Sequence, residues 1–184
     1  YHVFIVTNRH VMENNSSLVV RFNSINSHPA KDYDIPVIDE SGAPIWKSHP
    51  DTEIDLAAIC LDADFLHDEG MSYEYFHSDL HVMPLHQMAK QGVSEGDFIY
   101  VLGFPMGIMA PHRQYVISRT GIIARLRDAM EGTNKDFMID SMVFPGNSGG
   151  PVINKPEIIS IEGTSSVNSP YLIGIVSSYL TYTD

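Results

Sequence analysis

The chain has 184 residues, 43% of them hydrophobic, which is enough to bury a core in one large domain or two small ones and excludes a disordered segment. Its formal net charge of −12 at pH 7 argues against nucleic-acid binding through phosphate neutralisation, and no apolar run approaches the roughly 20 residues of a membrane span. A single cysteine, Cys60, excludes an internal disulfide, so packing must supply the stability.

Short apolar or alternating runs bounded by turn residues predict an all-β chain, arranged as a barrel or a sandwich. In chain order, the expected strands cover residues 3–6, 18–22, 54–61, 98–102, 114–117, 122–126, 137–139, 151–153 and 171–179. Helix signals are few, namely a single turn over residues 8–12 and a helix over 80–91 that ends at Gly92. Residues 62–91 lack strand-like periodicity and are expected to link two halves of the chain.

The first candidate for acid–base chemistry is His10, just past the end of the first predicted strand. The apolar run of residues 3–6 predicts a buried strand that ends at Thr7 and Asn8. Histidine can take up and return a proton near neutral pH. An ordinary surface or core histidine fits the same position, so His10 alone does not indicate catalysis.

The second candidate is Asp55, the last acid before the apolar stretch of residues 56–61. A carboxylate at the mouth of a buried strand is placed to be desolvated and held in one orientation. An ordinary strand-end carboxylate fits the same pattern. Cys60 lies within this stretch and is expected to be a buried thiol.

The third candidate is Ser148, within the run Phe-Pro-Gly-Asn-Ser-Gly-Gly-Pro at residues 144–151. Three glycines in five residues add backbone entropy that folding must remove, and they are tolerated where the backbone turns tightly or approaches another group. Ser148 supplies a hydroxyl for nucleophilic attack. A plain surface turn has the same composition, so the interpretation depends on a base and an acid elsewhere.

Together the three segments resemble the trypsin-like serine peptidases, most closely the HtrA (Deg) type. The resemblance rests on Thr7-Asn8-Arg9-His10-Val11, Asp55-Leu56-Ala57 and Gly146-Asn147-Ser148-Gly149-Gly150-Pro151. The order His, Asp, Ser is that of the chymotrypsin architecture. Residues 96–105 and 118–123 resemble strands of a second barrel, and residues 173–177 resemble the strand along which such enzymes bind substrate.

The resemblance implies an all-β, chymotrypsin-like double β-barrel with the active site in the cleft between the barrels. The N-terminal barrel, with His10, Asp55 and the linker, is expected over residues 1–84. The C-terminal barrel, with Ser148, is expected over residues 85–184. Because only nine residues precede His10 and few follow Tyr179, terminal segments of the barrels are expected to be missing. No PDZ domain of the kind often attached to HtrA proteins is found in these residues.

The resemblance also implies a serine endopeptidase that hydrolyses peptide bonds through an acyl-enzyme intermediate. Ser148 would be the nucleophile, His10 the general base, and Asp55 the acid that fixes the imidazole. The oxyanion hole would lie at Gly146, Asn147 and Ser148, with the N–H groups of Gly146 and Ser148 aimed at the developing charge. No cofactor or metal is expected.

Asn147 departs from one branch of this architecture. Enzymes switched on by cleavage at a new N-terminus carry an acid directly before the nucleophile, and that acid pairs with the freed amine. Asn147 is neutral at this position. We therefore predict that no such ion pair forms and that any regulation works by ordering loops.

Substrate selection is expected to depend on residues before the nucleophile and at the end of the last strand. The resemblance places Met142, Val143, Ser177, Ser178 and Tyr179 there. None is charged, and the bulk of Tyr179 predicts a shallow site for small or medium apolar side chains. An extended polypeptide substrate would pair with the main chain of residues 175–179.

Other interpretations stay open at this point. His77, His81, His86 and Asp79 lack the ligand spacing of a known metal site. A catalytically silent module of the same fold that binds extended peptides or protein partners is the alternative function, since a fold does not dictate activity. The resemblance favours an extracytoplasmic location, periplasmic or secreted, and gives no oligomeric state.

Overall fold

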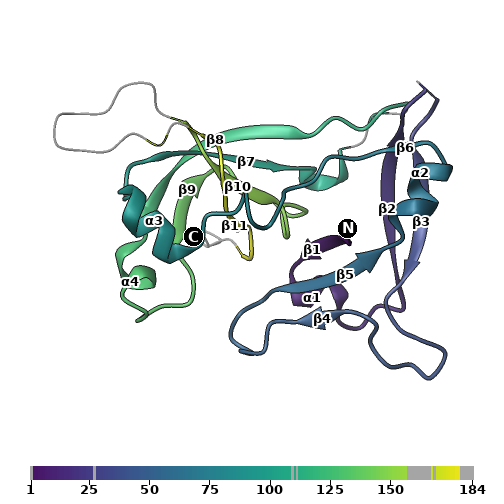
Figure 1. Ribbon diagram of the computed structural model, residues 1–184, viewed down its shortest axis with the longest axis horizontal. Coiled ribbons are helices and arrows are strands. Elements are labelled where there is room, and N and C mark those ends of the chain that lie inside the picture. Colours follow the sequence, from purple (N-terminus) through teal and green to yellow (C-terminus); the bar gives the residue numbers. More distant parts are fainter. Residues whose placement is uncertain are drawn as a thin grey trace, which may run out of the picture. The chain divides into compact units, whose positions relative to one another are not determined.

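The computed structural model describes residues 2–26, 28–108, 110, 112–156, 167 and 169–178 (Figure 1). Within these residues the chain is mostly β, as predicted. It divides into two compact units. The first contains residues 1–75 and 107–116, and the second contains residues 76–106 and 117–184. No helix of the described residues has the length and apolar character needed to cross a membrane.

In the first unit, one sheet carries the two segments that hold His10 and Asp55. Strands β1 (Val3–Thr7), β5 (Ala57–Leu61) and β4 (Lys47–Ser48) form it in the order β1-β5-β4. The antiparallel register pairs Thr7 with Ala57. The end of β1 therefore lies beside the start of β5, which brings the residues after Thr7 to those before Ala57.

A second sheet of this unit contains β3 (Lys31–Pro36), β2 (Ser17–Ser24) and β6 (Met71–Ser72), in that order. Two short helices, α1 (Arg9–Met12) and α2 (Ala63–Asp68), complete the unit. One buried cluster lies under β1 and β5, and another under β2 and α2. The buried residues of these clusters are Met12, Val37, Ala57 and Ile59, and Phe22, Leu66 and Met71.

The second unit is built on one five-stranded antiparallel sheet in the order β11-β10-β7-β8-β9. Its strands are β7 (Phe98–Gly103), β8 (Ile117–Arg125), β9 (Met138–Ser141), β10 (Pro151–Asn154) and β11 (Leu172–Ile175). The remaining elements are α3 (Leu85–Gln91), the 3-10 turn η1 (Pro105–Gly107) and α4 (Arg127–Met130). A mostly β, sheet-based unit agrees with the fold that the resemblance implies, and closure into two barrels stays a prediction.

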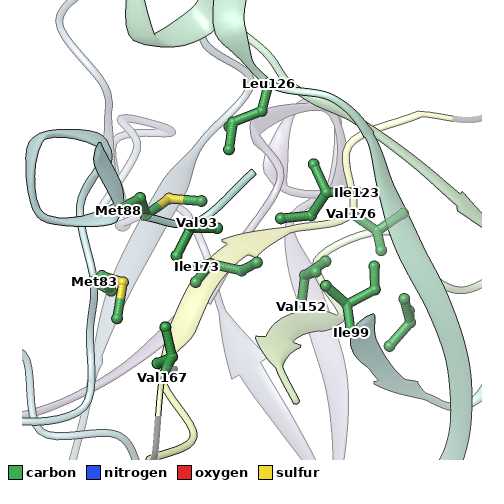
Figure 2. Close-up of a cluster of buried hydrophobic side chains, with 11 residues drawn as sticks. Met83, Met88, Val93, Ile99, Ile123, Leu126, Val152, Val167, Ile173 and Val176 are labelled. Carbon is green, nitrogen blue, oxygen red and sulfur yellow. The ribbon is translucent and has the colours of Figure 1, made fainter. Parts of the chain in front are cut away.

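The core of the second unit gathers side chains from α3 and from the strands β7, β8, β10 and β11, which Figure 2 draws as sticks. Each fully buried aliphatic side chain stabilises the fold by roughly 1.5–3 kcal/mol. The cluster therefore holds in place the strand β10, which begins directly after the serine loop. Its buried members are Met83, Met88, Val93, Ile99, Val101, Ile123, Leu126, Val152, Val167, Ile173 and Val176.

The division into units differs from the predicted boundary after residue 84. Residues 76–84 belong to the second unit. Met83 is buried in its core and donates its backbone N–H to the Leu172 carbonyl at 2.9 Å, while Leu172 donates to His81 at 2.7 Å. Residues 107–116, in turn, pack with the first unit. Neither exchange leaves a periodic pattern in the sequence.

Three expectations about single elements need correction. Cys60 is exposed, because β5 alternates and Cys60 pairs with Phe4 on the outward side of the sheet. Phe4 and Val6 are themselves about half exposed, so β1 is not a buried strand. The strand expected over 122–126 begins earlier, because β8 runs from Ile117 through Gly121 to Arg125, whereas residues 114–116 of the other expected strand lie outside any strand. A Cβ at Gly121 would lie 2.4 Å from the Asp140 carbonyl, so this glycine marks a close approach of β9 and not a break.

Candidate active site

His10 and Asp55 are joined by two hydrogen bonds. The His10 Nδ1 atom lies 2.6 Å from Asp55 Oδ2, and the His10 backbone N–H donates to Asp55 Oδ1 at 3.0 Å. One carboxylate therefore holds both the ring and the main chain of the histidine. With Nδ1 directed at Asp55, the Nε2 atom on the other side of the ring is the position for proton transfer.

Asp55 is suited to remain ionised at neutral pH. Burial, the largest single influence, raises its pKa, but hydrogen bonds from the ring and backbone of His10 and from the Arg9 backbone together hold that pKa below its usual value. The Asp55 side chain is 25% exposed and the His10 side chain 51% exposed. The pair is thus fixed on the carboxylate side and reachable on the imidazole side.

The loop before Asp55 is tied to the helix that carries His10. Arg9 donates from Nη2 to the Thr52 carbonyl at 2.5 Å and forms an ion pair from Nε to Glu13 at 3.4 Å. Glu13 lies four residues after Arg9, at the end of the α1 turn. The bond from Arg9 to Thr52 joins residues 43 positions apart in the sequence, so no local pattern predicts it.

The loop around Ser148 is held by backbone hydrogen bonds within the loop and to neighbouring segments. Asn147 donates to the Phe144 carbonyl at 3.1 Å, and Gly150 donates to the Asn147 carbonyl at 2.8 Å. Gly149 donates to the Val176 carbonyl at 2.9 Å, which attaches the loop to the end of β11. Ser148 itself is half-buried.

The backbone N–H groups of Gly146 and Ser148 have no protein acceptor among the described residues. Their directions follow from the planarity of the peptide group, in which C=O and N–H point opposite ways. The Pro145 carbonyl accepts the Met106 N–H at 2.8 Å, and the Asn147 carbonyl accepts the Gly150 N–H. Both carbonyls are therefore anchored by hydrogen bonds. The N–H groups of Gly146 and Ser148 are thereby fixed in the direction opposite to these carbonyls.

Asn147 differs from its expected place in the oxyanion hole. Its N–H is donated to Phe144, so this group is not available to a substrate oxygen. Its side chain is 2% exposed, and its Oδ1 atom has no hydrogen-bond partner among the described residues. No acidic group stands at this position to pair with an amine.

Gly146 occupies a backbone conformation that only glycine adopts readily, with φ at 91°. A Cβ atom there would lie 3.2 Å from the Met106 nitrogen and 3.3 Å from the Phe104 oxygen. Both the conformation and the crowding therefore require glycine at 146. The resulting loop presents a serine hydroxyl beside two anchored donors.

Comparison with known protein families matches residues 2–157 of the 184 to the trypsin-like peptidase domain. The chain belongs to the trypsin-like peptidase family. The match spans His10, Asp55 and Ser148, and it supports a serine peptidase acting on polypeptides. No curated protein matches the chain significantly.

The residues expected to select substrate in this trypsin-like peptidase domain differ from one another in exposure. Met142 is 72% exposed, whereas Val143 packs against the core of the second unit. Ser177 is half-buried and Ser178 is exposed. Tyr179 lies outside the described residues.

Arg119 is a residue of this region that sequence reasoning missed. From β8 it donates Nη1 to the Met142 carbonyl at 2.7 Å, and its guanidinium lies 4.5 Å from the centre of the Phe144 ring. Arg119 therefore braces the segment that leads into the serine loop. The pairing depends on the register of β8 against β9, which no local pattern reveals.

Two of the histidines considered for a metal site, His77 and His81, form a local turn, and His86 lies in α3. The His77 backbone N–H donates to His81 Nδ1 at 3.1 Å, and the two rings are 5.3 Å apart. Over the part of the chain that the structure describes, no group of three or more metal-ligating side chains occurs. The hydrogen bond occupies the Nδ1 atom of the His81 ring.

Proposed function

We propose that this protein is a serine endopeptidase in which Ser148, His10 and Asp55 act as a catalytic triad. The observation that carries the proposal is the two hydrogen bonds between His10 and Asp55. A carboxylate that binds both the Nδ1 side of an imidazole and the backbone of the same residue fixes its tautomer and its orientation. A histidine held in this way can act as the general base for a serine nucleophile.

The reaction follows from the groups present. His10 Nε2 takes the proton from Ser148 as the hydroxyl oxygen attacks the carbonyl carbon, and the imidazolium is stabilised by ionised Asp55. The tetrahedral intermediate collapses when His10 returns the proton to the leaving nitrogen, which breaks the peptide bond and leaves an acyl-enzyme on Ser148. Water, deprotonated by His10 in the same way, hydrolyses this ester and restores the hydroxyl.

The charge that develops on the substrate oxygen would be bound by the N–H groups of Gly146 and Ser148. Their anchored carbonyls support this role because the donors need not reorient during the reaction. Removal of one such donor in comparable enzymes costs about 2.7–4 kcal/mol of transition-state stabilisation. Asn147 contributes its side chain to the packing of the loop and no donor to the oxyanion.

The finer assignments are proposals of the same kind. We place the protein closest to the HtrA type on the residues around His10 and Ser148. A preference for small or medium apolar side chains is supported by the uncharged residues Met142, Val143, Ser177 and Ser178, with Tyr179 assigned from the sequence. The substrate would bind as an extended strand along residues 175–179.

Labelling with a fluorophosphonate, which traps activated serines, tests the function. We expect the wild-type protein to be modified at Ser148, and both Ser148→Ala and His10→Ala to lose the modification. Ser118→Ala, which removes an exposed serine from β8, is the matched control and should label like wild type. Failure of the folded wild-type protein to label, with a peptide partner still bound, would overturn the proposal in favour of a silent binding module.

A further inference from the structure

Asn8 stands at a helix cap without acting as one. It precedes the α1 helix with φ −77° and ψ 149°, which is the extended conformation of an N-cap residue. Asparagine at this position usually accepts a hydrogen bond from a backbone N–H of the first turn. The Asn8 side chain makes no such bond.

The side chain of Asn8 is directed instead to the acid of the acid–base pair. Asn8 Nδ2 donates to the backbone carbonyl of Asp55 at 3.0 Å, across 47 positions of sequence. The residue is 0% exposed, and its Oδ1 atom has no hydrogen-bond partner among the described residues. Burying an unpaired amide oxygen and giving up a helix cap both destabilise the fold. Stability alone therefore does not account for asparagine at this position.

The geometry points to Asn8 as a positioning residue for the His10–Asp55 pair, an inference that rests on the proposed function. Asn8 is fixed because it directly follows Thr7, which is paired with Ala57 in the sheet. Its amide holds the main chain of Asp55, while His10 holds the carboxylate of the same residue. With both ends of Asp55 held, the carboxylate is confined to the orientation that meets His10 Nδ1.

Two substitutions of Asn8 separate positioning from stability. Asn8→Ser removes the amide donor but keeps a residue that caps helices well. Asn8→Leu removes the donor and keeps the branched shape of the buried side chain. Asn15→Ser is the matched control, because Asn15 Nδ2 also donates to a backbone carbonyl, that of Val11, at the far end of the same helix and at the surface.

The experiment compares kcat and KM for an N-acyl-alanine p-nitrophenyl ester, together with urea unfolding midpoints. A loosened acid–base pair should lower kcat about 10- to 100-fold in both Asn8 variants. KM should stay unchanged, because Asn8 is buried, and the midpoint of Asn8→Ser should stay near that of wild type. Asn15→Ser should keep the wild-type kcat. Wild-type kcat in both Asn8 variants, or a fall in kcat that only follows a lower midpoint, overturns the inference.

A proton NMR measurement tests the role of Asn8 independently of the proposed function. A proton on His10 Nδ1 that is held against Asp55 at 2.6 Å should give a far-downfield proton resonance, whether or not the protein hydrolyses anything. We expect this resonance to broaden by exchange with water in Asn8→Ser and to stay unchanged in Asn15→Ser. If wild type shows no hydrolysis and no labelling, the proposed function fails while the resonance still decides the role of Asn8.

Discussion

Replacing Gly146 with alanine tests the anchored donors of the serine loop. At φ 91° an alanine is strained by about 1–3 kcal/mol. Its Cβ would also lie 3.2 Å from the Met106 nitrogen and 3.3 Å from the Phe104 oxygen, both shorter than the ordinary contact range of 3.4–4 Å. Turning the Pro145–Gly146 peptide relieves both, but it breaks the bond from Met106 to Pro145 and points the Gly146 N–H away from the oxyanion.

Loss of that donor should cost about 2.7–4 kcal/mol in the transition state, which corresponds to a fall in kcat of about 10²- to 10³-fold. The assay is steady-state hydrolysis of the N-acyl-alanine p-nitrophenyl ester. The KM of Gly146→Ala is expected to stay near that of wild type. Gly132→Ala is the control, because Gly132 also has a positive φ, 72°, but has open space around it. It should lose about 1–2 kcal/mol of folding free energy and no activity. A Gly146→Ala protein that keeps wild-type kcat at a stability equal to Gly132→Ala would refute the reasoning.

Three further predictions concern stability and exposure. Backbone N–H groups of Leu126 and Arg127 lower the pKa of Glu95 to about 2, so its stabilisation is present above pH 4.5 and lost as the pH falls toward 2. Glu95→Gln should therefore be less stable than wild type in urea at pH 7 and equal to it near pH 2, and a difference that persists there would contradict this account. Met106 has φ 54°, so Met106→Gly should raise the unfolding free energy by up to about 1 kcal/mol, and a decrease would show that the left-handed turn is unstrained. Cys60 is exposed, so a maleimide should modify the native protein, whereas reaction only after unfolding would place the thiol in the core.

The sequence was informative where function depends on short segments. The contexts of His10, Asp55 and Ser148 lie within a few residues of each side chain, and so does the end of α3 at Gly92, which has the expected positive φ of 75°. Helix α2 also carried a local signal that was missed, because the Asp62 side chain caps it by accepting the Phe65 N–H at 2.9 Å. This cap divides the predicted linker of residues 62–91.

The contacts that position the site could not be predicted from local patterns. The bond from Asn8 to Asp55 depends on the register that pairs Thr7 with Ala57. The strand β3 gives a weak signal because Tyr33 lies between two aspartates, Ile35 is followed by Pro36, and the apolar content of the segment is low. Pairing between distant segments is set by packing of the whole unit, which single-sequence periodicity does not contain.

The central claim is that Ser148 and His10 act as one catalytic unit. It is tested most directly by kcat for Ser148→Ala, His10→Ala and the double variant, each checked for folding by urea unfolding. If the two residues act together, the double variant should be no slower than the slower single variant, because removing either member already abolishes the shared step. Independent, multiplicative losses in the double variant, or an unchanged kcat in either single variant, would contradict the assignment of the triad.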